Sequence, residues 1–170
     1  MRSISTLQHP IPPTWDRDSE ILILGSFPSV KSRECGYYYG HPQNRFWKVL
    51  ASVFQDDCPG SKDEKRGFLL RHHVAVWDVI ASCGIAGSAD SSIRDAVPND
   101  IRMILSGAEI RQIICNGSTS FRLYNRLILP VTGREAVCLP STSPANAGWT
   151  QDRLREAWSV IAETGHDPNS

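Results

Sequence analysis

The side chains best suited to chemistry in this chain are neutral: a histidine, two carboxamides and several hydroxyl groups. His41 and Asn44 lie in an eleven-residue segment, 37–47, which begins with three successive tyrosines. A second carboxamide, Asn116, comes directly before Gly117 at the end of an apolar run. Three aromatic rings beside an amide and a histidine indicate a pocket that stacks a flat ring, rather than a packed core.

Several common kinds of site are not indicated. The chain has no Gly-x-x-x-x-Gly-Lys loop, no Gly-x-Gly-x-x-Gly fingerprint and no carboxylate pair in its polar segments. Its five cysteines are widely spread, odd in number and never in a Cys-x-x-Cys pair, so we expect neither a metal nor a cofactor. Two of them, Cys115 and Cys138, fall in apolar runs and are expected in the core.

Amides and hydroxyls still suffice for one kind of reaction. An amide does not take up a proton at neutral pH, but it can hold a water molecule and stabilise charge. That is enough where the bond breaks early and the leaving group departs as a stabilised anion, as when a nucleobase leaves its sugar. Positioning and electrostatics then supply the catalysis.

Four short apolar runs, 21–24, 74–77, 110–115 and 136–139, are expected to be the strands that position these groups. Runs that are apolar on both faces are typical of a parallel sheet covered by helices. Each run ends in small polar residues, and ligands bind beyond the carboxyl ends of such strands. Segment 81–92, after the second run, is expected to be a loop at the same edge.

Helices are expected between the strands, over 45–54, 61–71 and 118–129, and two more after the caps Asn99 and Thr150. The alternation predicts a three-layer α/β/α fold with a small, mostly parallel four-stranded sheet. We expect one domain over residues 1–170, with a core at about 18–164 and a disordered tail at 165–170.

Composition restricts the possible partners and location. Eighteen basic and eighteen acidic residues cancel, so any contact with nucleic acid must use a local basic patch. No run of eighteen apolar residues and no apolar signal-peptide core is present. We therefore expect a cytoplasmic protein without a membrane partner, most simply a monomer.

These motifs resemble the uracil-DNA glycosylase superfamily over roughly residues 20–160. The stretch HPQNRFWK at 41–48, after a Gly-x-x-Pro strand end at 25–28, is similar to its mismatch-specific branch. The stretches YYGHPQNRFW at 38–47 and LPSTSPA at 139–145 are most similar to its hypoxanthine-DNA glycosylase branch. The resemblance implies a monofunctional enzyme that flips a deaminated base out of DNA, most simply hypoxanthine, and leaves an abasic site for base excision repair.

The resemblance also implies roles for single residues. Uracil enzymes commonly carry a catalytic Asp or Asn where this chain has Phe27, so the water-orienting amide is expected to be Asn44. Tyr39 would stack on the flipped base, Asn116 would face its pairing edge, and the backbone of Ser26 and Phe27 would donate to it. His41 keeps two interpretations, a polar contact near the water and a structural cap.

Two loops are implied to touch damaged DNA, either duplex or single-stranded. The first would bind phosphates near the lesion and the second would enter the minor groove, with Ala145 at the wedge position. The residues concerned are Pro28, Ser29, Lys31 and Ser32 in the first loop, and Ser141, Thr142, Ser143, Pro144, Ala145 and Asn146 in the second.

Other interpretations stay open at this point. Each polar segment alone can be an ordinary turn or helix cap. Excision of uracil from G/U mismatches is the nearest functional alternative. A Ser hydrolase using Ser26, His41 and Asp78 lacks the Gly-x-Ser-x-Gly turn of that class. A non-catalytic nucleic-acid-binding module is the third alternative.

Overall fold

A parallel sheet with helices on both faces forms the body of this computed structural model, which describes residues 5–8, 11–27, 32, 34, 36–85 and 93–164. Its strands, in the order β3-β2-β6-β7, are all parallel. They are β2 (Ile21–Gly25), β3 (Val74–Asp78), β6 (Gln112–Asn116) and β7 (Val137–Leu139). The predicted parallel sheet is therefore confirmed.

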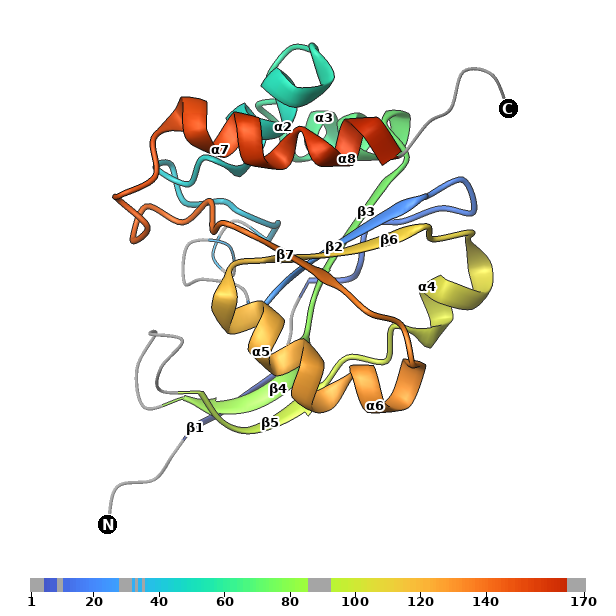
Figure 1. Ribbon diagram of the computed structural model, residues 1–170. Helices are drawn as coiled ribbons and strands as arrows, with labels where there is room; N and C mark the ends of the chain where they lie inside the picture. The colour runs from blue at the N-terminus through green and yellow to red at the C-terminus, as the bar shows by residue number, and fades with distance from the viewer. Residues whose placement is uncertain are drawn as a thin grey trace.

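The helices make the outer two layers. Figure 1 shows α2, α3, α7 and α8 together over one face of the sheet, and α4, α5 and α6 toward the other. This arrangement confirms the predicted three-layer fold. The helices are α2 (Phe46–Phe54), α3 (Lys62–Arg71), α4 (Arg102–Gly107), α5 (Ser118–Leu127), α6 (Leu129–Thr132), α7 (Gln151–Trp158) and α8 (Val160–Thr164).

Local caps explain several of the helix starts. Ser61 accepts a hydrogen bond from the Glu64 amide through its hydroxyl, and Thr150 does the same for the Arg153 amide, as the sequence predicts. The predicted cap at Asn99 is wrong. Its buried side chain instead donates to the backbone oxygens of Asp78 and Ile80, and no side chain of the described residues caps α4.

A small antiparallel sheet departs from the sequence prediction. Strands β1 (Ser5–Gln8), β4 (Ile80–Ile85) and β5 (Ile93–Pro98) pair in the order β1-β4-β5. The predicted loop over 81–92 is thus wrong for its first residues, which form β4, while residues 86–92 lie outside the described part. The Ser and Gly residues of β4 conceal it, because β-propensity depends on the strands that pair with it.

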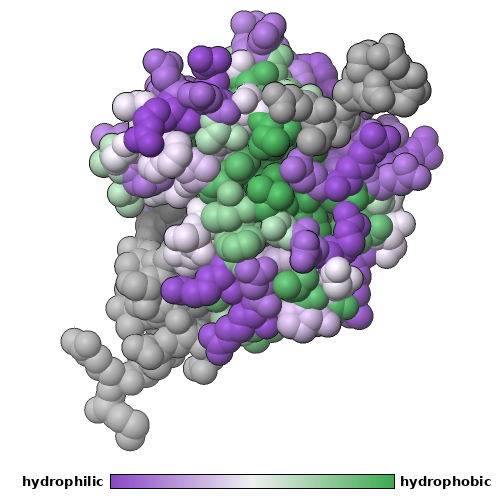
Figure 2. All heavy atoms as spheres, in the orientation of Figure 1, coloured by the Kyte–Doolittle hydropathy of each residue, from purple (hydrophilic) through white to green (hydrophobic). Residues whose placement is uncertain are grey.

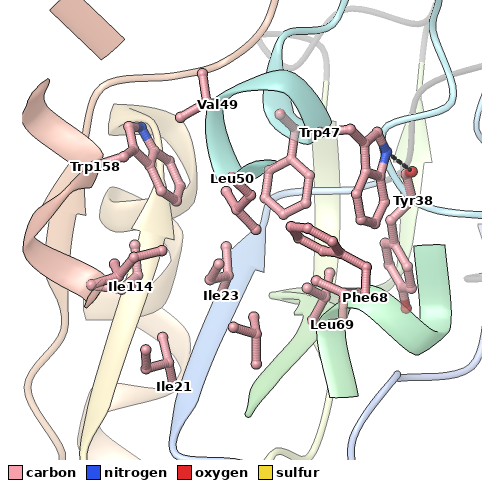
Figure 3. Packing of buried hydrophobic residues seen from close by; sticks show 14 of the residues in the cluster. Ile21, Ile23, Tyr38, Trp47, Val49, Leu50, Phe68, Leu69, Ile114 and Trp158 are labelled. Atoms are coloured by element: carbon pink, nitrogen blue, oxygen red, sulfur yellow. Dashed lines mark hydrogen bonds between the residues drawn. The ribbon is translucent and has the colours of Figure 1, made fainter. Parts of the chain in front are cut away.

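The core that positions the strand ends lies between the sheet and α2, α3 and α7. Figure 3 shows Ile21, Ile23 and Ile114 of the sheet facing Leu50 and Trp158 of the helices, and all five are at most 1% exposed. Burying one such side chain stabilises the fold by about 1.5–3 kcal/mol. A second cluster fills the opposite face under α4 and α5. The sheet is therefore fixed on both sides.

The edge strand β7 corrects one expectation about the cysteines. Cys115 on β6 is fully buried as predicted, but Cys138, its neighbour on β7, is exposed.

In the space-filling view of Figure 2, an apolar area crosses the middle of the face between the more polar helix surfaces. Val137 of β7 belongs to the exposed apolar residues of the chain. In the described residues, no helix is long and apolar enough to cross a membrane.

Candidate active site

The carboxyl ends of the four parallel strands meet at one edge, where the polar segments were expected to gather. Gly25 at the end of β2 is in register with Asp78 of β3, and Asn116 of β6 is in register with Leu139 of β7. The loops that follow are tied together, because the Gly117 amide donates to the Leu139 oxygen at 2.9 Å. The strand ends therefore form a single candidate site.

A chain of hydrogen bonds joins the two carboxamides through Thr142. The Thr142 hydroxyl lies 2.8 Å from the Asn44 Oδ1 and 3.0 Å from the Asn116 Nδ2. The Thr142 amide also donates to the Asn116 Oδ1 at 3.1 Å. Asn44 and Asn116 come from distant parts of the sequence, and the fold brings these two predicted site residues together.

Two hydrogen bonds fix Asn44 just before the start of helix α2. Its backbone amide donates to the His41 oxygen at 2.9 Å, and its Oδ1 accepts from the Phe46 amide at 3.0 Å. These two bonds close a turn and satisfy one of the free amides at the start of α2. Because Phe46 is fully buried in the core, the Asn44 side chain is fixed relative to the sheet.

Asn116 makes two side-chain hydrogen bonds to Thr142, one from its Nδ2 to the Thr142 hydroxyl and one from the Thr142 backbone amide to its Oδ1. A carboxamide has two N–H groups and two oxygen lone pairs, so each of these atoms keeps one further hydrogen-bonding position. The expected contact of Asn116 with the pairing edge of a base stays a prediction.

Tyr39 lies beside this chain, in a strained backbone conformation. Its φ is 52°, which non-glycine residues seldom adopt. One face of its ring stacks on Phe46 at 3.9 Å between centroids. Its hydroxyl is buried next to the Asn116 amide without hydrogen-bond geometry. The predicted stacking of Tyr39 on a flipped base must therefore use the ring face that Phe46 leaves open.

The environment of the Tyr39 hydroxyl is acidic and enclosed. Burial raises the pKa of Tyr39 well above its usual value, and the charge of Asp78 raises it further, while the Asn116 amide acts in the opposite direction. A Cβ on Gly25 would lie 2.3 Å from the Asp78 Oδ1 and 3.2 Å from the Tyr39 hydroxyl. Glycine at the end of β2 therefore leaves the space that these two side chains occupy.

The other two tyrosines of the segment belong to the core, contrary to the expectation of a pocket. Tyr37 and Tyr38 are 6% and 2% exposed. The Tyr37 hydroxyl is 2.7 Å from the Thr14 hydroxyl, and the Tyr38 hydroxyl donates to the Ile11 oxygen at 3.1 Å. Each ring is buried because its polar end finds a partner more than twenty residues earlier in the chain.

Arg45 ties the start of α2 to the loop after β7. Its guanidinium donates to the backbone oxygens of Ser143, Asn146 and Trp149, and its own amide donates to the Thr142 oxygen at 3.1 Å. The sequence motif did not indicate that Arg45 holds this loop, because Arg45 and the loop are about a hundred positions apart. Arg45 therefore fixes three points of the loop that is expected to enter DNA.

Within that loop, Ala145 at the expected wedge position is exposed. The side chain of Asn146 turns inward and donates to the Ser141 oxygen at 3.0 Å. The partly buried Trp149 ring is covered by Arg153, with 4.4 Å between the guanidinium carbon and the ring centroid. Arg153 brings a positive charge beside the loop, as a local DNA-binding patch requires.

Two predicted DNA contacts do not fit the structure. The side chains of Ser32 and Thr142 are 2% and 0% exposed, and both are hydrogen-bonded inside the protein. The Ser32 hydroxyl accepts from the Gly40 amide at 3.0 Å, which holds the tyrosine segment. Pro28, Ser29 and Lys31 lie outside the described residues.

The backbone after β2 is fixed by its neighbour. The Val79 amide donates to the Gly25 oxygen at 2.8 Å and the Ile80 amide to the Ser26 oxygen at 3.0 Å. The Phe27 ring is buried in the second core cluster. The predicted contacts of Ser26 and Phe27 with a base through their backbone stay predictions.

His41 acts here as a local cap. Its Nδ1 accepts from the Gln43 amide at 3.1 Å, and its backbone oxygen accepts from the Asn44 amide. A catalytic triad requires the histidine to donate through one ring nitrogen to a carboxylate. Because the Nδ1 of His41 accepts from a backbone amide, the geometry favours the structural interpretation of His41 and contradicts the Ser26–His41–Asp78 triad.

Among the side chains that the structure describes, no group of three or more His, Cys, Asp or Glu residues is arranged to hold a metal ion. The site instead consists of two carboxamides, a buried hydroxyl between them, an aromatic ring and a buried carboxylate. Such groups hold water and donate hydrogen bonds to developing charge.

Comparison with known proteins identifies the family of this chain. The family model of the uracil DNA glycosylase superfamily matches residues 12–162. A protein of Methanosarcina acetivorans named hypoxanthine DNA glycosylase is 32% identical over 151 residues, which cover 88% of this chain and 94% of the relative. A protein of the same name from Methanosarcina barkeri is 33% identical over 150 residues, covering 87% and 93%.

A solved structure gives the same result for the fold. The solution NMR structure of a Methanosarcina acetivorans protein, described as a candidate uracil DNA glycosylase, superposes with a TM-score of 0.80 at 30% identity. The match covers 95% of this chain and all of that one. With a strand-end site built from carboxamides and a family match over nearly its whole length, the chain belongs to the uracil DNA glycosylase superfamily.

Proposed function

We propose that this protein is a monofunctional DNA glycosylase that excises hypoxanthine from DNA and leaves an abasic site. The observation that carries the proposal is the pair Asn44 and Asn116, joined through Thr142 at the ends of the parallel strands. Both relatives compared above are named for this activity. Removal of a deaminated base is the first step of base excision repair.

The reaction is a hydrolysis of the bond between the sugar C1′ and the base nitrogen. As this bond lengthens, its electron pair moves onto the base and the sugar develops positive charge. A water oxygen then bonds to C1′, and one water proton passes to the base or to solvent. No cofactor is needed, because the enzyme supplies positioning and hydrogen bonds to the departing base.

The DNA must present the base outside the helix. Extruding a nucleotide costs a few kcal/mol, and least for a damaged or mismatched pair, which favours lesions. Tyr39 would receive the flipped base, and the loop at 141–149 would take its place in the duplex. Stacking on an aromatic ring contributes about 1–3 kcal/mol per base.

The experiment uses duplexes that carry one deoxyinosine, treated with alkali after incubation so that abasic sites become strand breaks. We expect breaks with the wild-type protein only after alkali. Asn44→Ala should lower the single-turnover rate by about 10² or more, as for loss of an oxyanion-hole donor. Binding without breaks would support the non-catalytic module instead, and a near-normal rate in Asn44→Ala would remove Asn44 from the reaction.

Excision of uracil is the second candidate, favoured by the description of the solved relative. Phe27 argues against it as the main activity, because its ring is buried in the core and offers no hydrogen bond to a water. Parallel assays on deoxyinosine and deoxyuridine duplexes decide between the two by their ratio of kcat/KM.

The proposal places the enzyme on DNA as a monomer in the cytoplasm. Binding to DNA is supported by the positive charge of Arg153 beside the loop at 141–149 rather than by net charge, which is zero. Measuring the molecular mass in solution, with and without a lesion duplex, tests the monomer.

A further inference from the structure

Thr142 lies between the two carboxamides, at the centre of the site. Its side chain is fully buried and makes hydrogen bonds to both Asn44 and Asn116. A buried hydroxyl without partners would cost free energy, but this one is satisfied on both sides. Its function therefore concerns the amides, not the DNA.

The direction of every hydrogen bond in this chain is determined. Backbone amides only donate, so the atom of Asn44 that faces the Phe46 amide must be Oδ1. By the same reasoning the Oδ1 of Asn116 faces the Thr142 amide, and its Nδ2 donates to the Thr142 hydroxyl. The hydroxyl has one proton, which it must donate to the Asn44 Oδ1.

This direction determines what Asn44 is able to do. A carbonyl oxygen has two lone pairs, and both lone pairs of the Asn44 Oδ1 are used, by the Phe46 amide and the Thr142 hydroxyl. The Asn44 Nδ2 makes no hydrogen bond with the described residues. What Asn44 offers to a ligand is therefore its N–H group.

We propose that Thr142 is the positioning residue that makes Asn44 a hydrogen-bond donor in the glycosylase reaction. The proposal rests on the proposed function and deepens it. Asn44 holds the attacking water, or the departing base, by donating to a lone pair. It does not accept a water proton, which passes instead to the base or to solvent as the C1′–N bond breaks.

The first test replaces the hydroxyl of Thr142. Thr142→Val keeps the shape but leaves the Asn44 oxygen with a free lone pair, so that the amide is able to rotate. We expect the single-turnover excision rate at saturating deoxyinosine DNA to fall about tenfold, as for loss of one buried hydrogen bond. Thr142→Ser keeps the hydroxyl and should restore most of that rate.

A matched control uses another buried threonine. Thr14 is 1% exposed, and its hydroxyl bonds to Tyr37 in the core. Thr14→Val removes the same group at similar burial and should leave the excision rate unchanged. Thermal unfolding of both variants separates a loss of fold from a loss of positioning.

A double-mutant cycle tests whether Thr142 acts through Asn44. If it does, Thr142→Val should cause no further loss in the Asn44→Ala background, because the oriented amide is already gone. If the fold-decreases in rate of the two single variants instead multiply in the double variant, the proposal is overturned.

The pH profile of Asn44→Asp is the sharpest test. A protonated carboxyl accepts through one oxygen and donates through the other, as the amide does, while a carboxylate only accepts. With Asn44 as a donor, the rate of this variant should rise about tenfold for each unit by which the pH falls toward the pKa of the new carboxyl. A rate that stays constant or falls as the pH falls toward that pKa indicates an acceptor, because the ionised carboxylate already accepts, and overturns the proposal.

These outcomes are distinct from failure of the proposed function. A wild-type protein that is inactive on every lesion duplex would reject the glycosylase. An active wild type with a wild-type rate in Thr142→Val would reject only the positioning by Thr142.

Discussion

Arg45 offers the most direct test of how the fold holds the loop at 141–149, which we propose enters DNA. Its guanidinium bonds to three backbone oxygens of that loop, those of Ser143, Asn146 and Trp149. Arg45→Met keeps most of the aliphatic stem and removes all three bonds. Arg45→Lys leaves a point charge that cannot span three carbonyls at once.

The magnitude follows from the number and exposure of these bonds. Hydrogen bonds to charged groups contribute about 1.5–3 kcal/mol each when buried, and neutral ones about 0.5–1.5. Because Arg45 is partly exposed, water can replace part of the loss, and we expect about 2 kcal/mol in total for Arg45→Met. Since about 1.4 kcal/mol is a tenfold change, this corresponds to a roughly 30-fold change in an equilibrium.

The assay is excision of hypoxanthine at limiting and at saturating DNA. A loop that loses its anchor must be ordered when DNA binds, so kcat/KM should fall roughly 30-fold while the single-turnover rate at saturation changes little. Arg102→Met is the control, because Arg102, the first residue of α4, makes an exposed ion pair with Asp100. Wild-type kcat/KM in Arg45→Met would refute the anchoring, and an equal loss at saturation would place Arg45 in the chemical step.

Three further predictions concern the same edge of the sheet. Gly117 has φ 98°, and a Cβ there would lie 3.0 Å from the loop after β7, so Gly117→Ala should lower the free energy of unfolding by about 1–3 kcal/mol. Gly67→Ala, on α3 with open space around it, should raise the free energy of unfolding slightly. Urea titration of both variants measures the two changes. Burial raises the pKa of Cys115 to about 12, so in a chain that keeps only Cys115 and Cys138 as cysteines, only Cys138 should react with a thiol reagent at pH 8 until the protein unfolds. Tyr39→Ala should weaken binding of a deoxyinosine duplex more than binding of an undamaged one, and equal losses would contradict stacking.

The strands and most helices could be predicted because their signals are local. The run 21–24 is buried on both faces in β2, and Ser61 and Thr150 cap the helices that they precede. The small antiparallel sheet could not be predicted in this way. Its strand β4 pairs with β1 across more than seventy residues, and a Ser- and Gly-containing segment has no period that indicates such pairing.

The sequence predicted where the candidate site lies better than it predicted the contacts among its residues. The family resemblance selected Asn44, just before α2, and Asn116, at the end of β6, and Thr142 in the loop after β7 joins them. The bond from Thr142 to Asn44 spans 98 residues, and no spacing rule connects them. Thr142 was expected to contact DNA because its loop resembles the family's minor-groove loop. The sequence gives no sign of whether its hydroxyl faces solvent or a carboxamide.

The segment 37–47 explains why a motif can indicate a site even when the first interpretation of its residues is wrong. Tyr38 and Trp47 belong to the core, where the Trp47 indole donates to the Tyr38 oxygen, the bond drawn in Figure 3. Asn44, a few residues away, belongs to the site. Core packing therefore fixes the backbone from which the Asn44 amide, the proposed catalytic group, projects, because a buried ring lies on each side of it in the sequence. A substitution that loosens the core at Trp47 should then lower excision as well as stability, since the amide needs a fixed backbone to meet Thr142.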